Sequence, residues 1–263
     1  MLSAYKTYVE PVIGYAAAVW APNASDLCKN QLQRIQNRAL RMATGCHTAS
    51  SLSHLHQEAK FALVGDHLDM LSTQHLASSL RPSHPSNAAV KEPSGPRSMK
   101  HTLQSRFLPT LTPHLDARGN IDPADYKKVR KSVHTVSVAS IISRLEPNRL
   151  LDTQPPPISP SESRLSRIQR TTLAQLRSGH CRLLGDYKVL TGISNSALCP
   201  QCLFRRHTVP HIFNCDAVPT LLTLRDLWIN PVKVVELLVS LPSFVTLIPK
   251  DQHPPRPPPE PPP

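Results

Sequence analysis

The sequence predicts a mainly α-helical protein with a small N-terminal helical bundle, proline-rich linkers, a basic C-terminal helix beside a zinc knuckle, and a disordered polyproline tail. Three observations predict this class. Apolar residues recur every three or four positions in much of 1–80 and 161–240, as on one face of a helix. The 28 prolines divide the 263 residues into short segments. Cysteine and histidine residues with metal-ligand spacing fall between Cys199 and Cys215.

Changes in composition place four regions along the chain. We expect residues 1–80 to be helical, and residues 81–160 to form a proline-rich linker with a short helix near 124–145. Residues 161–240 carry the basic helix and the Cys/His cluster, and residues 241–263 form the tail. Aromatic residues make up only 5% of the chain. We therefore expect several small cores rather than one large core.

The first helix is expected from Leu2 to Trp20, where apolar residues keep helical spacing, and Pro11 is expected to kink or split it. A second helix is expected between residues 23 and 45. Asn23 or Ser25 can cap its start, and Gly45 can adopt the left-handed conformation that ends it.

Three arginines follow one face of this second helix, because Arg34, Arg38 and Arg41 are spaced by four and three residues. Such a row can follow a phosphate backbone, and a plain solvated helix face explains it equally well. Further helical spacing covers residues 50–80. From Pro82 to Pro113 the prolines alternate with Ser, His and Lys, which is typical of a linker with little core.

A basic helix is expected to open at Ser161, after the prolines at 155–157 and 160. From 164 to 188 there are six basic residues against the single acid Asp186. This density favours nucleic-acid binding for the C-terminal half. The residues that we expect to contact phosphates here are Arg164, Arg167, Arg170 and Arg177.

Cys199, Cys202, His211 and Cys215 have the types and spacing of a structural zinc site. A C-x2-C pair makes a turn, and the x3 spacing puts His211 and Cys215 one helical turn apart. His207 is the alternative fourth ligand, because it follows Cys202 at a knuckle-like spacing; His211 is favoured. Unrelated cysteines in a cysteine-rich region are the other interpretation.

The chain carries 30 Lys and Arg against 18 Asp and Glu, for a net charge of +12. RNA or DNA is the first expected partner, an acidic membrane surface the second, and a solvated basic surface explains the charge as well. No run reaches the roughly eighteen apolar residues that span a bilayer. Glu10 and Pro11 precede the apolar run 12–21, which makes a poor signal peptide. We expect a nuclear or cytoplasmic protein, not secreted, with no membrane partner and reduced cysteines.

The last ten residues, 254–263, include eight prolines and are expected to be extended. Pro254 to Pro257 fit the P-x-x-P pattern that docks on aromatic-lined grooves. An interaction scaffold that recruits such a domain is therefore an alternative function. An incidental low-complexity end is the simpler interpretation.

Several motifs occur in one order along the chain. They are YKTYVEPV from Tyr5 and LQRIQNRALR from Leu32, then HLDMLSTQ from His67, LAQLRSG from Leu173, the cluster with HIFNC from His211, and LRDLW from Leu224. In this order they resemble the C-terminal part of reverse transcriptases from non-LTR retrotransposons of the jockey-like group. The resemblance covers about residues 1–240.

The resemblance implies a thumb-like segment in residues 1–80, and a knuckle that engages the element's RNA or its target DNA. A polymerase needs paired carboxylates to hold two metal ions, and no Asp-Asp pair occurs in this chain. We therefore expect no catalytic residues here, and expect the palm to lie upstream of Met1. The sequence predicts a fragment of an RNA-directed DNA polymerase, inactive alone, that keeps nucleic-acid-binding parts. A remnant without function is a further alternative.

Overall fold

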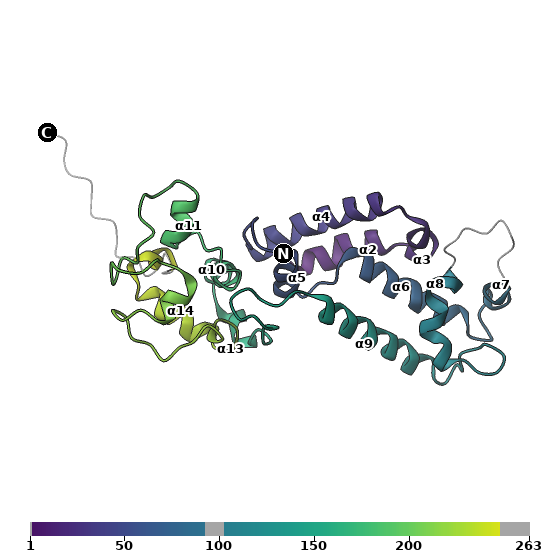
Figure 1. The fold of residues 1–263 in the computed structure, drawn as a ribbon. Helices are drawn as coiled ribbons and strands as arrows, with labels where there is room; N and C mark the ends of the chain where they lie inside the picture. The colour runs from purple at the N-terminus through teal and green to yellow at the C-terminus, as the bar shows by residue number, and fades with distance from the viewer. Residues whose placement is uncertain (1, 93–102, 248–263) are drawn as a thin grey trace, which may run out of the picture. The chain divides into compact units, whose positions relative to one another are not determined.

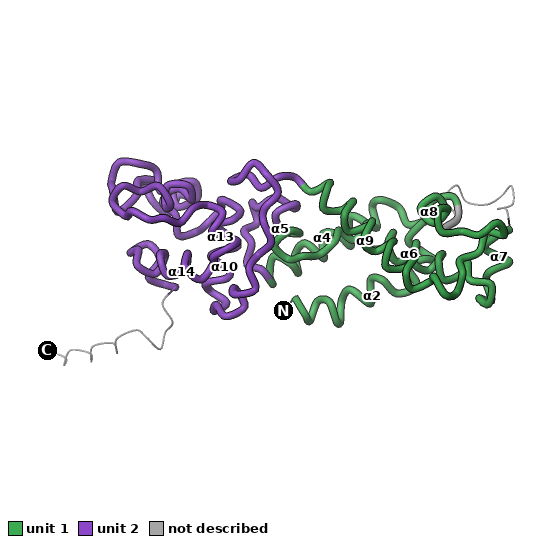
Figure 2. Tube along the Cα trace, turned by 90° about the horizontal axis from the view of Figure 1, so that it is seen from below, with its two compact units in different colours: residues 1–43, 55–145 green, residues 44–54, 146–263 purple. Residues whose placement is uncertain are grey.

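The structure is a computed structural model that describes residues 2–92 and 103–247. Within these ranges it is mainly helical and contains no β-strand, which confirms the mainly α-helical part of the prediction. The chain divides into two compact units (Figure 2). Unit 1 comprises residues 1–43 and 55–145, and unit 2 comprises residues 44–54 and 146–263. None of the described helices is long and apolar enough to cross a membrane.

The N-terminal segment of unit 1 is a broken helix. It runs through α1 (Leu2–Ala4), the π-helical turn η1 (Tyr5–Val9), α2 (Glu10–Gly14), α3 (Ala17–Trp20) and the 3₁₀ turn η2 (Ala21–Asn23). The wide π turn ends at Val9, two residues before Pro11, which lacks an N–H and crowds the preceding turn. The backbone stays in the right-handed helical region at Val9 and Glu10, so the helix is not split at Pro11. It breaks instead at Ala16, which adopts a left-handed φ of 49°.

Helix α4 (Asp26–Thr44) matches the expected second helix (Figure 1). The Ser25 hydroxyl accepts a hydrogen bond from the N–H of Cys28, and Gly45 follows the last turn with a φ of 77°. Asn23 lies in η2 instead of at the cap.

The polar residues of α4 join it to the turn at 61–64. The Gln33 side chain accepts from the N–H of Val64 and donates to Asn37, and Gln36 donates to the carbonyl of Ala62. Buried His56 lies 3.0 Å from the Asn37 amide oxygen. Burial is the main cause of the lowered pKa of His56, which keeps the ring neutral inside this network. Gln33, Gln36 and Asn37 of the LQRIQNRALR motif thus have structural roles.

Helix α6 (Val64–Ser79) is the central element of unit 1 and lies beside α3, α8 and α9 (Figure 1). Its first half buries Val64 and Leu68 against Ala17 and Ala21. The preceding helix is α5 (Leu52–Ala59), and a short α7 (Asn87–Lys91) follows α6.

The second half of α6 packs against residues that the sequence assigned to a linker. Helix α8 (Leu103–Leu111), the 3₁₀ turn η3 (Thr112–His114) and helix α9 (Tyr126–Arg144) complete unit 1, and α9 lies where the short helix was expected. Leu76 and Ala77 of α6 and the following Leu80 form one core with five buried residues of this region: Phe107 and Leu111 of α8, Ile121 of the connecting loop, and Val129 and Val133 of α9. The expected linker is therefore wrong for 103–121. Its apolar residues are few, but they reach the face that α6 leaves open.

Unit 2 contains η4 (Pro160–Arg164), α10 (Arg167–Arg177), α11 (Gly185–Leu190), α12 (Val209–Phe213), α13 (Asp226–Ile229), α14 (Pro231–Val239) and η5 (Pro242–Leu247). Its core includes Leu173, Leu176, Trp228, Leu238 and Phe244. The basic helix begins at Arg167, not at Ser161, because Ser166 and Gln169 form a reciprocal capping box.

The disordered tail was predicted to begin at residue 241, but the fold of unit 2 continues to residue 247. Leu241, Phe244 and Leu247 are buried in the core of unit 2, and η5 contacts α14. Residues 248–263, which include the P-x-x-P segment, lie outside the described residues.

Candidate metal centre

The first two predicted ligands lie on a tight backbone turn. Residues 198 and 206 form an isolated antiparallel bridge, and the N–H of Cys199 donates to the carbonyl of Arg205 at 2.7 Å. The N–H of Leu203 returns to the carbonyl of Cys199 at 2.9 Å, while Leu203 adopts a left-handed φ of 60°. The C-x2-C turn therefore holds both thiols on the same side of a small hairpin.

The other two ligands come from α12 and the residues after it. Pro210 occupies the first turn of this short helix, where a missing N–H costs nothing. Ile212 and Phe213 anchor the helix in the core, and this fixes the neighbouring His211 and the following Cys215.

Cys199, Cys202, His211 and Cys215 meet at one point. Their ligand atoms all lie within 4.8 Å of one another. The Sγ atoms of Cys199 and Cys215 are 4.0 Å apart, and the Sγ of Cys202 is 3.3 Å from Nε2 of His211. A zinc ion with bonds of about 2.3 Å to sulfur and about 2.0 Å to nitrogen sets ligand atoms about 3.5–3.8 Å apart. The cluster can therefore bind a metal ion such as zinc with small adjustments.

The surroundings of the four ligands favour a cation. Backbone N–H groups of Arg205 and Phe204 donate toward the sulfur of Cys202, and they lower the pKa of that thiol to about 6. Burial raises the pKa of Cys215, which makes its thiolate costly until a cation neutralises it. Three thiolates and one imidazole with no open position form a closed site that builds structure.

No family model, curated protein or solved structure matches this chain. The resemblance to retrotransposon reverse transcriptases therefore stays a prediction.

His207, the alternative ligand, lies outside the metal cluster. Its Nδ1 accepts a hydrogen bond from the N–H of Gly185 at 3.1 Å, and its ring packs edge-on against Phe244. Burial, followed by the charge of His211, lowers the pKa of His207 to about 4. A neutral imidazole used as a backbone acceptor is a structural residue, and His211 takes the metal-facing place.

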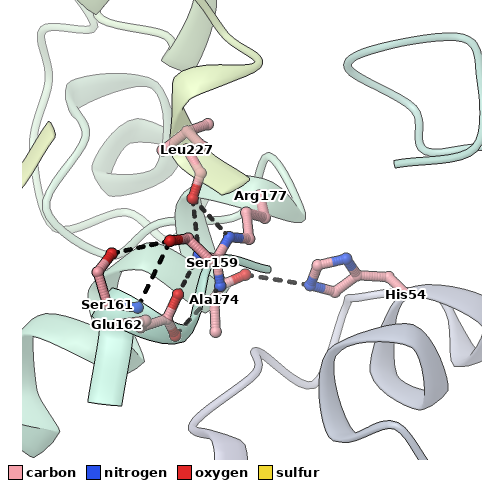
Figure 3. Close-up of polar contacts among 7 residues, drawn as sticks. All are labelled: His54, Ser159, Ser161, Glu162, Ala174, Arg177 and Leu227. Carbon is pink, nitrogen blue, oxygen red and sulfur yellow. Dashed lines mark hydrogen bonds and ion pairs between the residues drawn. The ribbon is translucent and has the colours of Figure 1, made fainter. Parts of the chain in front are cut away.

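Arg177 was predicted to contact phosphates, and the structure contradicts this. The side chain is fully buried; its guanidinium pairs with Glu162 and donates to the carbonyl of Leu227 (Figure 3). It also lies over the ring of Trp228, 5.9 Å from the centroid. A phosphate cannot reach a charge that is held in this way inside unit 2. The neighbouring carbonyl of Ala174, in the same figure, lies 3.1 Å from Nε2 of His54.

The other predicted arginines remain accessible. Arg34 and Arg38 are exposed on α4 of unit 1, and Arg41 is partly exposed. In unit 2, Arg164 is exposed at the end of η4, and Arg167 and Arg170 are exposed on α10.

The tip of the hairpin carries residues that the sequence interpretation missed. Phe204 is 89% exposed and Leu203 is 67% exposed, and the exposed Arg205 and Arg206 follow directly. We call residues 203–206 the knuckle tip. Arg206 pairs with Asp186, whereas no ion pair of Arg205 occurs among the described residues. The available signal was an aromatic residue next to two arginines immediately after Cys202.

Two other groups with the residue types of an active site have structural roles. Cys181, next to His180, is buried in the core, and its burial raises the thiol pKa to about 11, so it is no nucleophile. Asp66 and Asp69 on α6 pair with Arg144 and Arg106 at 2.6 and 2.7 Å. Among the described residues, the Cys/His cluster is the one group arranged to hold a metal ion.

Proposed function

We propose that unit 2 is a zinc-stabilised unit that binds single-stranded nucleic acid through the knuckle tip. The observation that carries this proposal is Phe204, a large aromatic side chain that is 89% exposed beside Arg205 on a hairpin held by the candidate zinc ligands. An exposed aromatic ring beside an arginine presents the two groups that an unpaired base and its phosphate can bind.

The chemistry of the tip suits an unpaired base. Base stacking on an aromatic side chain contributes about 1–3 kcal/mol per base and needs no particular sequence. Arg205 can neutralise the adjoining phosphate. Exposed Arg164, Arg167 and Arg170 supply further positive charge within unit 2, which attracts the phosphate backbone of a strand.

Zinc has a structural role in this proposal. Four ligand bonds replace a large core in fixing a turn of this size, because they join the C-x2-C turn to α12. Without the metal, three thiol groups in one place supply no comparable attraction. The tip then loses the support that presents Phe204 to a base.

We propose further that the ligand is the RNA, or the target DNA, of a non-LTR retrotransposon, and that the chain is a fragment of its RNA-directed DNA polymerase. The ordered motifs from Tyr5 to Trp228 support this part of the proposal. Extension of a primer on an RNA template by this chain alone would contradict it. We expect binding of the template without extension.

The test is fluorescence anisotropy of the full zinc-loaded chain with a labelled single-stranded RNA of about twelve nucleotides. We expect Phe204→Ala to weaken binding by about 5–150-fold, the loss of one stacked base. The matched control is Tyr15→Ala, which removes a ring that is 80% exposed in unit 1. This control should bind as the unmodified chain does.

The salt dependence tests the electrostatic part. Each neutralised phosphate of a single strand contributes a slope of about −0.7 to the dependence of log K on log salt. We expect Arg205→Gln to make this slope shallower by about one such contribution. Equal binding at low and high salt, or equal binding by Phe204→Ala and the unmodified chain, rules out the proposed interface.

A further inference from the structure

Unit 2 contains a pocket of about 360 Å³ next to the knuckle. It lies where the end of α10, helix α11 and the start of α12 meet, all within unit 2. This volume lies within the range of about 300–1,000 Å³ that is usual for small-molecule sites.

The walls of the pocket are mostly apolar and include one aromatic ring. Leu150, Leu184, Val209 and Pro210 line it together with Tyr187. The Tyr187 hydroxyl lies 2.5 Å from Nε2 of His47, and the two rings meet edge-on at 4.9 Å between centroids. This contact fixes the ring of Tyr187, so the wall it forms is rigid and suits a flat heterocycle.

A cation without a carboxylate partner lies on the lining. The guanidinium of Arg149 donates to Nε2 of His180 at 2.8 Å, and no ion pair of Arg149 occurs among the described residues, since Asp186 on the same lining pairs with Arg206. In contrast, Arg177 and Arg206 of the same unit each pair with an acid. A neutral imidazole orients the guanidinium without neutralising it, so the positive charge remains for an anion.

The backbone fixes this arginine further. Gly179, at the end of α10, has a φ of 75°, and a side chain there would meet Nε of Arg149 at 3.4 Å. Burial, then the charge of Arg149, lowers the pKa of His180, which keeps its Nε2 available as an acceptor. Thr208 and Asp186 add polar groups on the lining that can bind the edge of a heterocycle.

We propose that this pocket binds a single nucleotide, with the base between Tyr187 and the apolar wall and the phosphate on Arg149. A flat, uncharged heterocycle linked to one phosphate matches a flat apolar wall with one available cation at its edge. Two sources share this chemistry, a free mononucleotide and one unstacked nucleotide of a strand. Binding of a strand nucleotide rests on the proposed function, whereas binding of a free mononucleotide does not.

The test is titration of adenosine 5′-monophosphate into the isotope-labelled, zinc-loaded full chain, followed by NMR. We expect saturable shifts at the amides of Gly179, Tyr187 and Val209. Arg149→Gln should weaken this binding at least tenfold and leave the weaker binding of adenosine unchanged. Leu190→Glu, at a position lining the pocket that is 77% exposed, should weaken the phosphate form alone by repulsion.

Arg225→Gln is the matched control, because it removes an exposed arginine of unit 2 that does not line the pocket. It should bind the nucleotide as the unmodified chain does. Saturation by inorganic phosphate with equal affinity, or shifts that Arg149→Gln does not change, would overturn the proposal.

The two sources separate with the twelve-nucleotide RNA. If the free nucleotide does not bind, but RNA shifts the same amides and Arg149→Gln weakens that binding, the ligand is a strand nucleotide. If neither probe shifts these amides, the pocket proposal fails. Phe204→Ala tests the knuckle tip separately from the pocket. This variant should weaken RNA binding and leave the binding of adenosine 5′-monophosphate intact.

Discussion

Arg177 carries a buried charge that is paired with Glu162. Its side chain is 0% exposed and that of Glu162 is 12% exposed. Hydrogen bonds to the carbonyl of Leu227 use more of the guanidinium N–H groups. A pair of this kind joins η4, α10 and α13, although its net contribution is limited by desolvation.

We expect Glu162→Gln or Arg177→Met to lower the free energy of unfolding by about 3–5 kcal/mol, because each leaves a buried partner unpaired. Urea unfolding of the zinc-loaded chain measures the change. The double variant Arg177→Met with Glu162→Leu should recover most of the loss. Arg182→Gln, exposed beside α10, is the control, and a loss as large as that of Arg177→Met would contradict this account.

Leu203 adopts a left-handed conformation with a φ of 60°, which costs an L-residue about 1–2 kcal/mol. Its side chain is 67% exposed, so little apolar burial offsets this cost. We expect Leu203→Gly to stabilise the zinc-loaded chain by about 0.5–1 kcal/mol in urea unfolding. Leu221→Gly, at an exposed position without a positive φ, should give no gain. A destabilised Leu203→Gly chain would show that the leucine side chain supports the turn.

The sequence predicted single residues well where spacing carries the chemistry. The four ligands needed only the C-x2-C turn and the x3 pair, and the structure brings these four together. The prediction that Arg177 contacts phosphates was wrong. Its spacing resembles that of exposed Arg170, but its partner Glu162 lies in a separate turn. Helical periodicity contains no information on such a partner.

At the scale of elements, Asp226 controls the start of α13. Its carboxylate accepts from the N–H and hydroxyl of Thr223 at 2.7 and 2.8 Å, and from the Asn230 amide at 2.5 Å. Burial raises the pKa of this carboxyl, but the hydrogen bonds from Asn230 and Thr223 outweigh it, and the net pKa is below 3.8. Since the folded pKa is the lower one, the stabilisation is fully present above 3.8 and is lost as the pH falls through the folded pKa.

We expect Asp226→Asn to cost about 1–2 kcal/mol of stability at pH 7, because an amide cannot accept all these donors. Urea unfolding measures the cost, and a carbon-detected NMR titration should place the Asp226 pKa below 3.8. Glu236→Gln, exposed on α14, should change little. A midpoint above 3.8 would refute the proposed hydrogen-bond effect.

Elements with clear stop signals were predicted closely. Helix α4 starts after Ser25 and ends before Gly45, as its cap and its glycine indicate. The region 103–121 was misread because Pro109 and Pro113 are typical of linkers. Pro109 nevertheless lies inside α8, and Phe107 and Leu111 are held by α6. Tertiary packing, which a local pattern does not show, outweighs the proline penalty here.

At the scale of the whole molecule, each unit has cores of its own. The cores around Leu68 and Leu76 belong to unit 1, and the core around Trp228 belongs to unit 2. The four candidate ligands all lie in unit 2. We therefore expect removal of the metal to loosen unit 2 around the ligands and to leave the cores of unit 1 intact.

We expect one zinc per chain, and we expect a strong chelator to raise hydrogen exchange in 197–215 by at least tenfold while α6 keeps its protection. Hydrogen-exchange mass spectrometry with and without chelator measures this. Cys202→Ser should reproduce the effect without chelator, whereas Cys28→Ser, exposed in unit 1, should not. Equal loss of protection in both units would disprove independent behaviour.

Unit 2 takes residues 44–54 from between two parts of unit 1. The carbonyl of Gly45 accepts from Gln175, and His54 meets the carbonyl of Ala174. A ribosome makes the early segment more than a hundred residues before these partners. Residues 44–54 therefore lack these partners until residues 174–175 have been made, by which point the sequence of unit 1 is already complete at 145. A product that stops at 145 would leave this segment without its partners, and would be a target for proteases at that position.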